Sequence, residues 1–182
     1  MTEKHLNLVV CGAGPAADAG ILIRLAQEQS WTVTVTATQA ALSFIDLTEL
    51  EQLTGVSVRT GYGQSRGSKR DIRPVDALII APATYNTINK LASGIADTYV
   101  LTSVAEVLGR RAPAVVVPFV NAALASRHPF QSSVARLRDE GVRVLQGSDD
   151  DWEPHTPGFG DRQRAEFPWP LALEAITRSW QP

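Results

Sequence analysis

Residues able to hold a polar ligand gather where buried apolar segments of the chain give way to predicted helices. The first such turn contains Gly12, Ala13, Gly14 and Pro15, and its glycines let the backbone come close to an anion. The helix predicted to follow presents free N–H groups to a phosphate. Because the third glycine of a dinucleotide-binding motif and the lysine of a P-loop are both missing, a tight turn explains the segment equally well.

Hydroxyl groups follow the next predicted strand. Thr36 and Thr38 stand where that strand ends, so each can cap the following helix or hydrogen-bond a phosphate. A third turn has a higher concentration of residues that can form hydrogen bonds or set the shape of the turn. These residues are Pro82, Ala83, Thr84, Tyr85, Asn86 and Thr87. This concentration predicts a binding site for a polar, planar ligand.

Two residues farther along the chain are candidates for chemistry on a substrate. Asn121 follows an apolar strand, and its amide can donate to and accept from a carboxylate or amide, although it could equally cap a helix. His155 could act as an acid or a base, although a loop histidine is more often simply solvated. His128 precedes Pro129 at a predicted helix start, which favours a structural role.

Two predicted loops leave alternatives open. The basic residues of the loop at 61–73 could clamp an anion or be solvated: Arg66, Lys69, Arg70 and Arg73. The aromatic residues that follow the acidic run 149–151 could form a lid over a ring system or pack the tail onto the core: Trp152, Phe159, Phe167 and Trp169.

Apolar segments indicate the elements that position these residues. Continuous apolar runs at 6–11, 77–81 and 115–117 are typical of strands buried on both faces, whereas 32–36 alternates. Shorter strands are predicted at 56–59 and 142–145, and helices near 21–26, 40–54, 88–92, from 97 onward, at 134–138 and at 171–180. Strands alternating with helices predict an α/β fold whose parallel sheet is covered on both faces.

Length and charge narrow the class of protein. The 182 residues predict one domain, with an extended flap at about 147–170, and the net charge of −2 argues against a nucleic-acid partner. No apolar run is long enough to cross a bilayer and no secretory signal is visible, which predicts a cytoplasmic protein. Cys11 stands alone, so we expect a buried thiol and neither an internal disulfide nor a metal site.

Several of these segments together resemble one family, the oligomeric flavin-containing cysteine decarboxylases, which includes phosphopantothenoylcysteine decarboxylase and the decarboxylases of lantibiotic precursors. The likeness runs from Leu6 to about Leu145. It includes the glycine-rich turn, residues 38–44, the family's Pro-Ala-Ser-Ala-Asn-Thr motif, here 82–87, and the helix at 88–97. It implies a flavodoxin-like sandwich, FMN held by the three turns described above, and a homotrimer that can assemble further. It also implies that Asn121 positions the substrate and that Asn86 orients flavin and substrate together.

Three departures from that family bear on the reaction. The position of the family's catalytic histidine holds Ser68, which cannot act as a base at neutral pH without help. No cysteine follows Cys11, which argues against phosphopantothenoylcysteine as the substrate. The family's motif Pro-x-Met-Asn-x-x-Met-Trp predicts a differently shaped pocket here, because it reads Pro118-Phe119-Val120-Asn121-Ala122-Ala123-Leu124-Ala125.

The sequence therefore favours an FMN-dependent decarboxylase or related tailoring enzyme acting on a peptide or a thiol-bearing carboxylate. A flavin prenyltransferase is one alternative, although Asn86 follows the decarboxylase motif and the arginine of that second family is replaced near Thr102. A non-catalytic flavin-binding or regulatory subunit is another alternative, because such a protein could lose the histidine and keep the fold.

Overall fold

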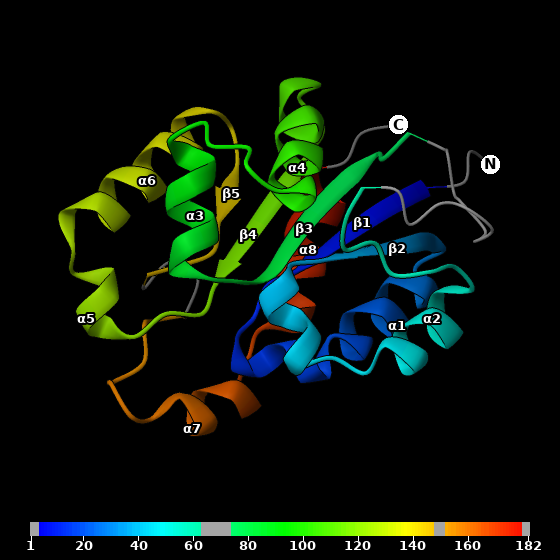
Figure 1. Ribbon diagram of the computed structural model, residues 1–182, viewed down its shortest axis with the longest axis horizontal. Coiled ribbons are helices and arrows are strands. Elements are labelled where there is room, and N and C mark those ends of the chain that lie inside the picture. The colour runs from blue at the N-terminus through cyan, green and yellow to red at the C-terminus, as the bar shows by residue number, and fades with distance from the viewer. Residues whose placement is uncertain (1–3, 63–73, 148–151, 180–182) are drawn as a thin grey trace.

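A parallel five-stranded sheet lies at the centre of the computed structural model, which describes residues 4–62, 74–147 and 152–179 (Figure 1). Its strands lie in the order β2-β1-β3-β4-β5. This is the strand order of flavodoxin-like folds, so the predicted fold class is confirmed. The strands are β1 (Lys4–Val10), β2 (Trp31–Ala37), β3 (Ala77–Ala83), β4 (Ala114–Pro118) and β5 (Arg143–Val144).

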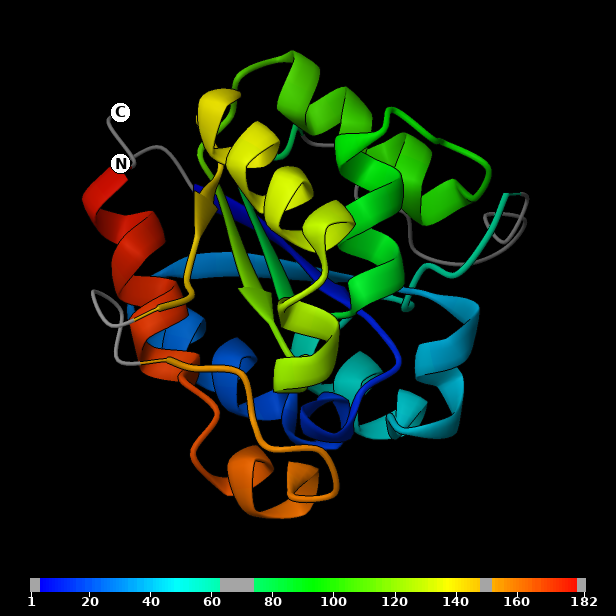
Figure 2. The same ribbon diagram turned by 90° about the vertical axis from the view of Figure 1, so that its left-hand side faces the viewer.

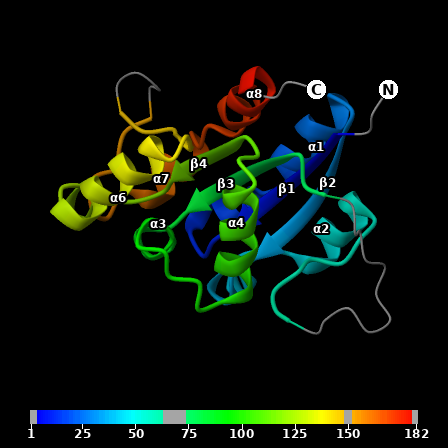
Figure 3. The same cartoon turned by 90° about the horizontal axis from the view of Figure 1, so that it is seen from above.

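Helices cover both faces of the sheet, as Figure 3 shows from above. One face carries α1 (Gly20–Glu28) and α8 (Trp169–Ser179), with α2 (Leu47–Thr54) packed beside α1. The other face carries α3 (Tyr85–Ala92), α4 (Tyr99–Gly109) and α6 (His128–Asp139). Short helical segments complete the described chain: η1 (Gly14–Asp18), η2 (Gln39–Ser43), α5 (Ala122–Ala125) and α7 (Gly160–Ala165).

The two apolar cores follow from the alternation of side chains along each strand. Leu8 and Ile79 are fully buried against the face of α1 and α8, whereas Val9 and Ile80 face α3, α4 and α6. Each central strand is therefore apolar on both sides, which explains the continuous apolar runs in the sequence. Burial on both sides fixes the register of the sheet, and with it the positions of the turns at its carboxyl edge.

Several predicted boundaries were wrong. The helix expected at 40–54 is interrupted, because Asp46 starts α2 by accepting a hydrogen bond from the Glu49 backbone N–H at 3.1 Å. The strand expected at 56–59 is reduced to a bridge between Thr36 and Arg59. The flap expected to be extended at 147–170 contains α7, which Figure 2 shows on the same side of the molecule as α5. Among the described residues, no helix has the length and apolar character needed to span a membrane.

Candidate functional site

A cavity of about 390 Å³ lies at the carboxyl ends of β1, β2 and β3, and we call it the strand-tip cavity. The chain leaves β1 towards β2 on one side, and β3 pairs with β1 on the other, so the cavity sits at the point where strand order reverses. Open α/β sheets bind ligands at this point, as flavodoxin binds its FMN. The cavity is lined by Gly12, Thr38, Gln39, Ala40, Thr60, Thr84, Asn86, Thr87, Lys90, Thr98, Val100 and Leu101.

Gly12 lets two strand ends approach each other at the cavity wall. A Cβ atom at this position would lie 2.7 Å from the Ala40 backbone, which is shorter than van der Waals contact allows. Only glycine fits this approach, so the turn after β1 and the 3₁₀ helix after β2 form one continuous surface. The requirement is steric rather than conformational.

Three of the five threonines that line the cavity each cap a helical segment. Thr38 accepts a hydrogen bond from the Ala41 N–H at 3.3 Å, and Thr98 accepts one from the Leu101 N–H at 3.2 Å. Thr84 accepts one from the Thr87 N–H at 3.3 Å. A capping hydroxyl still carries a hydrogen that it can donate to a ligand. The N-termini of α3 and α4 therefore face the cavity with their partial positive charge.

Cys11 lies beneath the third turn and is fully buried. Burial raises the pKa of its thiol, and hydrogen bonds with the Thr87 side chain and the Thr84 backbone offset part of that rise. The thiol is therefore neutral at physiological pH and forms part of the support of this turn. The expectation of a buried, unpaired cysteine is confirmed.

Lys90 is the single ionisable side chain that lines the cavity within the described residues. Its Nζ lies 2.6 Å from Asp97 Oδ2. It stands one helical turn after Asn86, so both side chains share one face of α3.

Five of the residues expected to bind the cofactor meet in the cavity: Gly12, Thr38, Thr84, Asn86 and Thr87. Thr36 does not line it, because it is buried in β2 and donates a hydrogen bond to Asn7 Oδ1 at 3.2 Å. Tyr85 also lies elsewhere, since its ring stacks on Phe130 and its hydroxyl accepts from Arg127 Nη1 at 3.2 Å.

The remaining cofactor candidates lie in the backbone around the cavity. Pro82 and Ala83 are buried in β3, and the Pro82 carbonyl accepts a hydrogen bond from the Cys11 N–H at 3.1 Å. Ala13 precedes η1 as its N-cap and Gly14 and Pro15 are its first two residues, and none of the three lines the cavity.

Asn121 and His155 are brought together by pairing between the exit of β4 and the flap. The Ala122 N–H donates to the His155 carbonyl at 2.8 Å, and the His155 ring lies 5.0 Å from the Phe119 ring, between centroids. Asn121 also caps α5, because its Oδ1 accepts from the Leu124 N–H at 2.9 Å. Neither residue lines the strand-tip cavity. The nearby Phe119 is linked to β3, because its backbone N–H donates to the Ala83 carbonyl.

Most flap aromatics pack the tail onto the core. Trp152 donates a buried hydrogen bond from Nε1 to the Pro118 carbonyl at 2.8 Å, and its ring meets Phe167 edge-on. Phe167 in turn lies against Trp169, whereas Phe159 is 59% exposed. Ser68 and the basic residues of the loop lie in 63–73, and the acidic run reaches 151, so these candidates fall outside the described residues.

Sequence reasoning missed Lys90, Thr98 and the pair Val100 and Leu101 as cavity residues. Lys90 could have been found from its spacing of four residues after Asn86. Thr98 is a usual capping residue, but the helix was predicted to begin at 97, two residues before α4 begins, which hid this role. The two apolar residues carry no signal of a ligand, because Val and Leu are usual in helix cores.

The match to a protein-family model decides the family. The model described as Flavoprotein matches residues 1–167. The chain belongs to the Flavoprotein family. The resemblance found in the sequence motifs is thereby confirmed, and this flavoprotein has a site whose hydroxyls, amide and apolar walls suit a flavin. The volume also lies within the range of small-molecule pockets, about 300–1,000 Å³.

Curated relatives of this flavoprotein include two proteins of coenzyme A synthesis. The probable phosphopantothenoylcysteine decarboxylase of Streptococcus mutans is 31% identical over 156 residues, which cover 80% of this chain and 83% of that protein. The coenzyme A biosynthesis bifunctional protein CoaBC of Mycolicibacterium smegmatis is 29% identical over 147 residues. That match covers 79% of this chain but only 35% of the bifunctional protein.

Solved structures agree with the fold. The FMN-dependent cysteine decarboxylase SpaF superposes with a TM-score of 0.68 at 26% identity, over 95% of this chain and 97% of that one. The FMN binding protein AtHal3 superposes with a TM-score of 0.72 at 19% identity, over 99% and 100% of the two chains. The second likeness shows the fold alone.

Proposed function

We propose that this flavoprotein binds FMN in the strand-tip cavity and uses it for the oxidative decarboxylation of a peptide or thiol-bearing carboxylate. The observation that carries the proposal is the convergence of Gly12, Thr38 and Asn86, from three different strand ends, on one cavity. FMN is the flavin named for SpaF, which has the same fold. A carboxy-lyase is the kind of enzyme named for both SpaF and the Streptococcus mutans relative.

The two ends of the cavity suit the two ends of FMN. Gly12 and Thr38 offer close backbone and a hydroxyl, which can hold the phosphate. Asn86 offers an amide to the polar edge of the isoalloxazine, and Val100 and Leu101 offer apolar surface to its rings. The ring end is thus assigned to α3 and α4, and the phosphate end to the turns after β1 and β2.

When bound, FMN would accept the two electrons that an oxidative decarboxylation removes from the substrate. The side chains have to hold the carboxylate and take a proton. Asn121 uses its Oδ1 to cap α5, so its Nδ2 is the group that we assign to the substrate carboxylate. His155 Nδ1 lies 3.1 Å from the Thr156 carbonyl, and donation there leaves Nε2 with a lone pair to accept the proton.

We extend the proposal to a homotrimer, or an assembly of trimers, with the flavin at the contact between subunits. The family resemblance supports this assembly. Its test is the molar mass in solution by light scattering, where three chain masses or a multiple of three supports the proposal and a monomer of 19.7 kDa contradicts it.

The function is tested first by the cofactor and then by the product. Purified protein should be yellow and should release FMN on denaturation, identified by chromatography against riboflavin and FAD. Peptides ending in cysteine and 4′-phosphopantothenoylcysteine are then offered separately, with carbon dioxide release and flavin bleaching as readouts. Release from either compound supports the decarboxylase, and the preferred compound identifies the substrate class.

The alternatives give different results in the same assays. Turnover of dimethylallyl phosphate, without release of carbon dioxide, would identify a prenyltransferase. Tight FMN binding with no response to any of these compounds would favour a binding subunit. Protein that remains colourless and takes up no FMN would overturn the proposal as a whole.

A further inference from the structure

Among the described residues, the one charged side chain that lines the strand-tip cavity is Lys90, which forms an ion pair with Asp97. The lysine side chain is 29% exposed and the aspartate side chain 50% exposed. Ion pairs this open to water contribute little to stability. The fold therefore depends little on this pair, whose lysine lines the cavity.

The turn after α3 brings the two charges together. The Ile95 N–H donates to the Lys90 carbonyl at 2.9 Å and the Gly94 N–H to the Leu91 carbonyl at 3.0 Å, which is a Schellman motif. Gly94 has φ of +71°, a conformation that favours glycine. The chain thus reverses, and Asp97 comes back over the last turn of α3. Lys90 is held at the cavity by this return.

We propose that Lys90 is the electrostatic partner of the flavin ring and that Asp97 is the positioning residue that holds and partly neutralises its ammonium. The inference rests on the proposed binding of FMN, whose ring end we assign to α3 and α4. A reduced flavin carries a negative charge on its pyrimidine edge at neutral pH. A cation beside that edge stabilises the reduced form and so raises the midpoint potential of the bound flavin.

Opposite substitutions within the pair should move that potential in opposite directions. K90Q removes the cation and leaves the carboxylate of Asp97 uncompensated, so reduction becomes harder. D97N removes the carboxylate and leaves the ammonium uncompensated, so reduction becomes easier. If the pair only joined α3 to the segment before α4, both variants would lose the same contact and the potential would not move in opposite directions.

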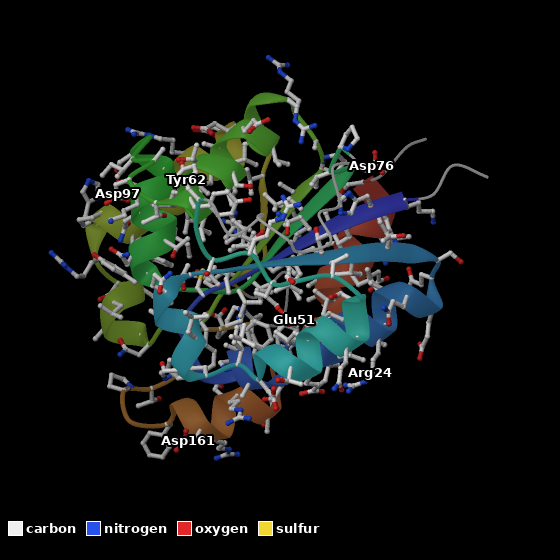
Figure 4. All side chains as sticks on the ribbon, turned by 45° about the vertical axis from the view of Figure 1, so that its right-hand side comes forward. Arg24, Glu51, Tyr62, Asp76, Asp97 and Asp161 are labelled. Atoms are coloured by element: carbon white, nitrogen blue, oxygen red, sulfur yellow. The ribbon has the colours of Figure 1, made fainter. Side chains whose placement is uncertain are left out.

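The experiment measures the midpoint potential of FMN-loaded protein by reduction against dyes of known potential. We expect K90Q to lower the ratio of reduced to oxidised flavin about tenfold at a fixed potential, which is about 30 mV for two electrons. D97N should raise the potential by a similar amount. K90R keeps the cation, so its potential should stay near that of the original protein. R24Q is the matched control, because Arg24 pairs with Glu49 at 2.8 Å on the α1 and α2 side, away from Asp97 (Figure 4).

Binding of riboflavin and FMN is measured on the same variants. If K90Q weakens FMN binding, leaves riboflavin binding unchanged and does not move the potential, Lys90 holds the phosphate and the proposal is overturned. Equal potentials in K90Q, D97N and R24Q would overturn it too. If the original protein takes up no FMN, the proposed function and this inference both fall, whereas loaded protein with unmoved potentials overturns the inference alone.

Discussion

Arg164 holds Asp18 through two hydrogen bonds, from Nε to Oδ2 at 2.7 Å and from Nη2 to Oδ1 at 3.0 Å. The hydrogen bond and charge of Asp18 raise the pKa of the Arg164 guanidinium, which favours its charged form. The pair ties α7 of the flap to η1, the segment that follows the glycine-rich turn. Gly14 lies next to the Arg164 side chain, since a Cβ on Gly14 would lie 3.7 Å from Arg164 Cδ.

Removing this tie should loosen the flap without unfolding the protein. We expect D18N to change the melting temperature little, because the pair is partly exposed and such pairs contribute about 0–1 kcal/mol. Hydrogen exchange in 160–165 and tryptic cleavage there should become faster. D161N is the comparison, because Asp161 of α7 (Figure 4) acts on Arg164 through its charge but makes neither of the two hydrogen bonds. Equal exchange in both variants would show that the tie does not hold the flap.

Gly12→Ala should damage the strand-tip cavity. The new Cβ would meet the Ala40 backbone at 2.7 Å, so the turn or η2 must move. Overpacking of this kind costs about 1–3 kcal/mol, and FMN affinity should fall with it. The checks are denaturant unfolding and fluorescence titration with FMN.

Gly109→Ala is the matched control for that substitution. A Cβ at Gly109, the last residue of α4, meets nothing within 4 Å. Its stability and FMN affinity should stay close to those of the original protein. If G12A binds FMN as well as G109A does, the turn after β1 is not part of the binding site.

Asn121 should contribute to stability through its side-chain oxygen and to substrate binding through its amide nitrogen. N121A loses the cap on α5 and should cost about 1 kcal/mol as well as activity. N121S keeps a capping oxygen, so its stability should be near normal while kcat/KM falls about 10- to 100-fold, the loss expected for a hydrogen bond to a charged group. Normal turnover by N121S would show that Asn121 only caps α5 and does not bind the substrate.

Cys11 should be unreactive in the folded protein and should make stability fall at alkaline pH. Because burial raises the pKa of the thiol above its ordinary value of 9.0, the folded state binds the proton more tightly than the unfolded state. The resulting stabilisation is complete below pH 9.0 and is lost as pH rises through the folded pKa.

The measurement compares the free energy of unfolding of the original protein and C11A between pH 8 and about 11. Lysines and tyrosines titrate in both proteins, so the difference between the curves isolates the thiol. That difference should shrink at higher pH by no more than about 1.4 kcal/mol per pH unit. A constant difference, or rapid labelling of Cys11 by a thiol reagent at pH 8, would contradict the buried, neutral thiol.

Neighbouring residues show how far the strand-tip turns could be predicted. Thr36 and Thr38 have the same chemistry and were assigned together, yet Thr36 is buried against Asn7 and Thr38 lines the cavity. Tyr85 and Asn86 are adjacent, yet one stacks on Phe130 and the other faces the cavity. The order of residues locates a turn, but a helix rotates successive side chains by about 100°, so packing decides which of them reach a ligand.

By itself the sequence determined the α/β class, the family, and the turns that line the strand-tip cavity, because these depend on local patterns: apolar runs, glycines and capping hydroxyls. Only the tertiary structure decided which side chains meet. Lys90 finds Asp97 through a reversal at Gly94, and His155 pairs with the exit of β4 far back in the chain. Contacts between distant segments depend on how helices and strands pack, and packing is a property of the whole chain rather than of any short segment.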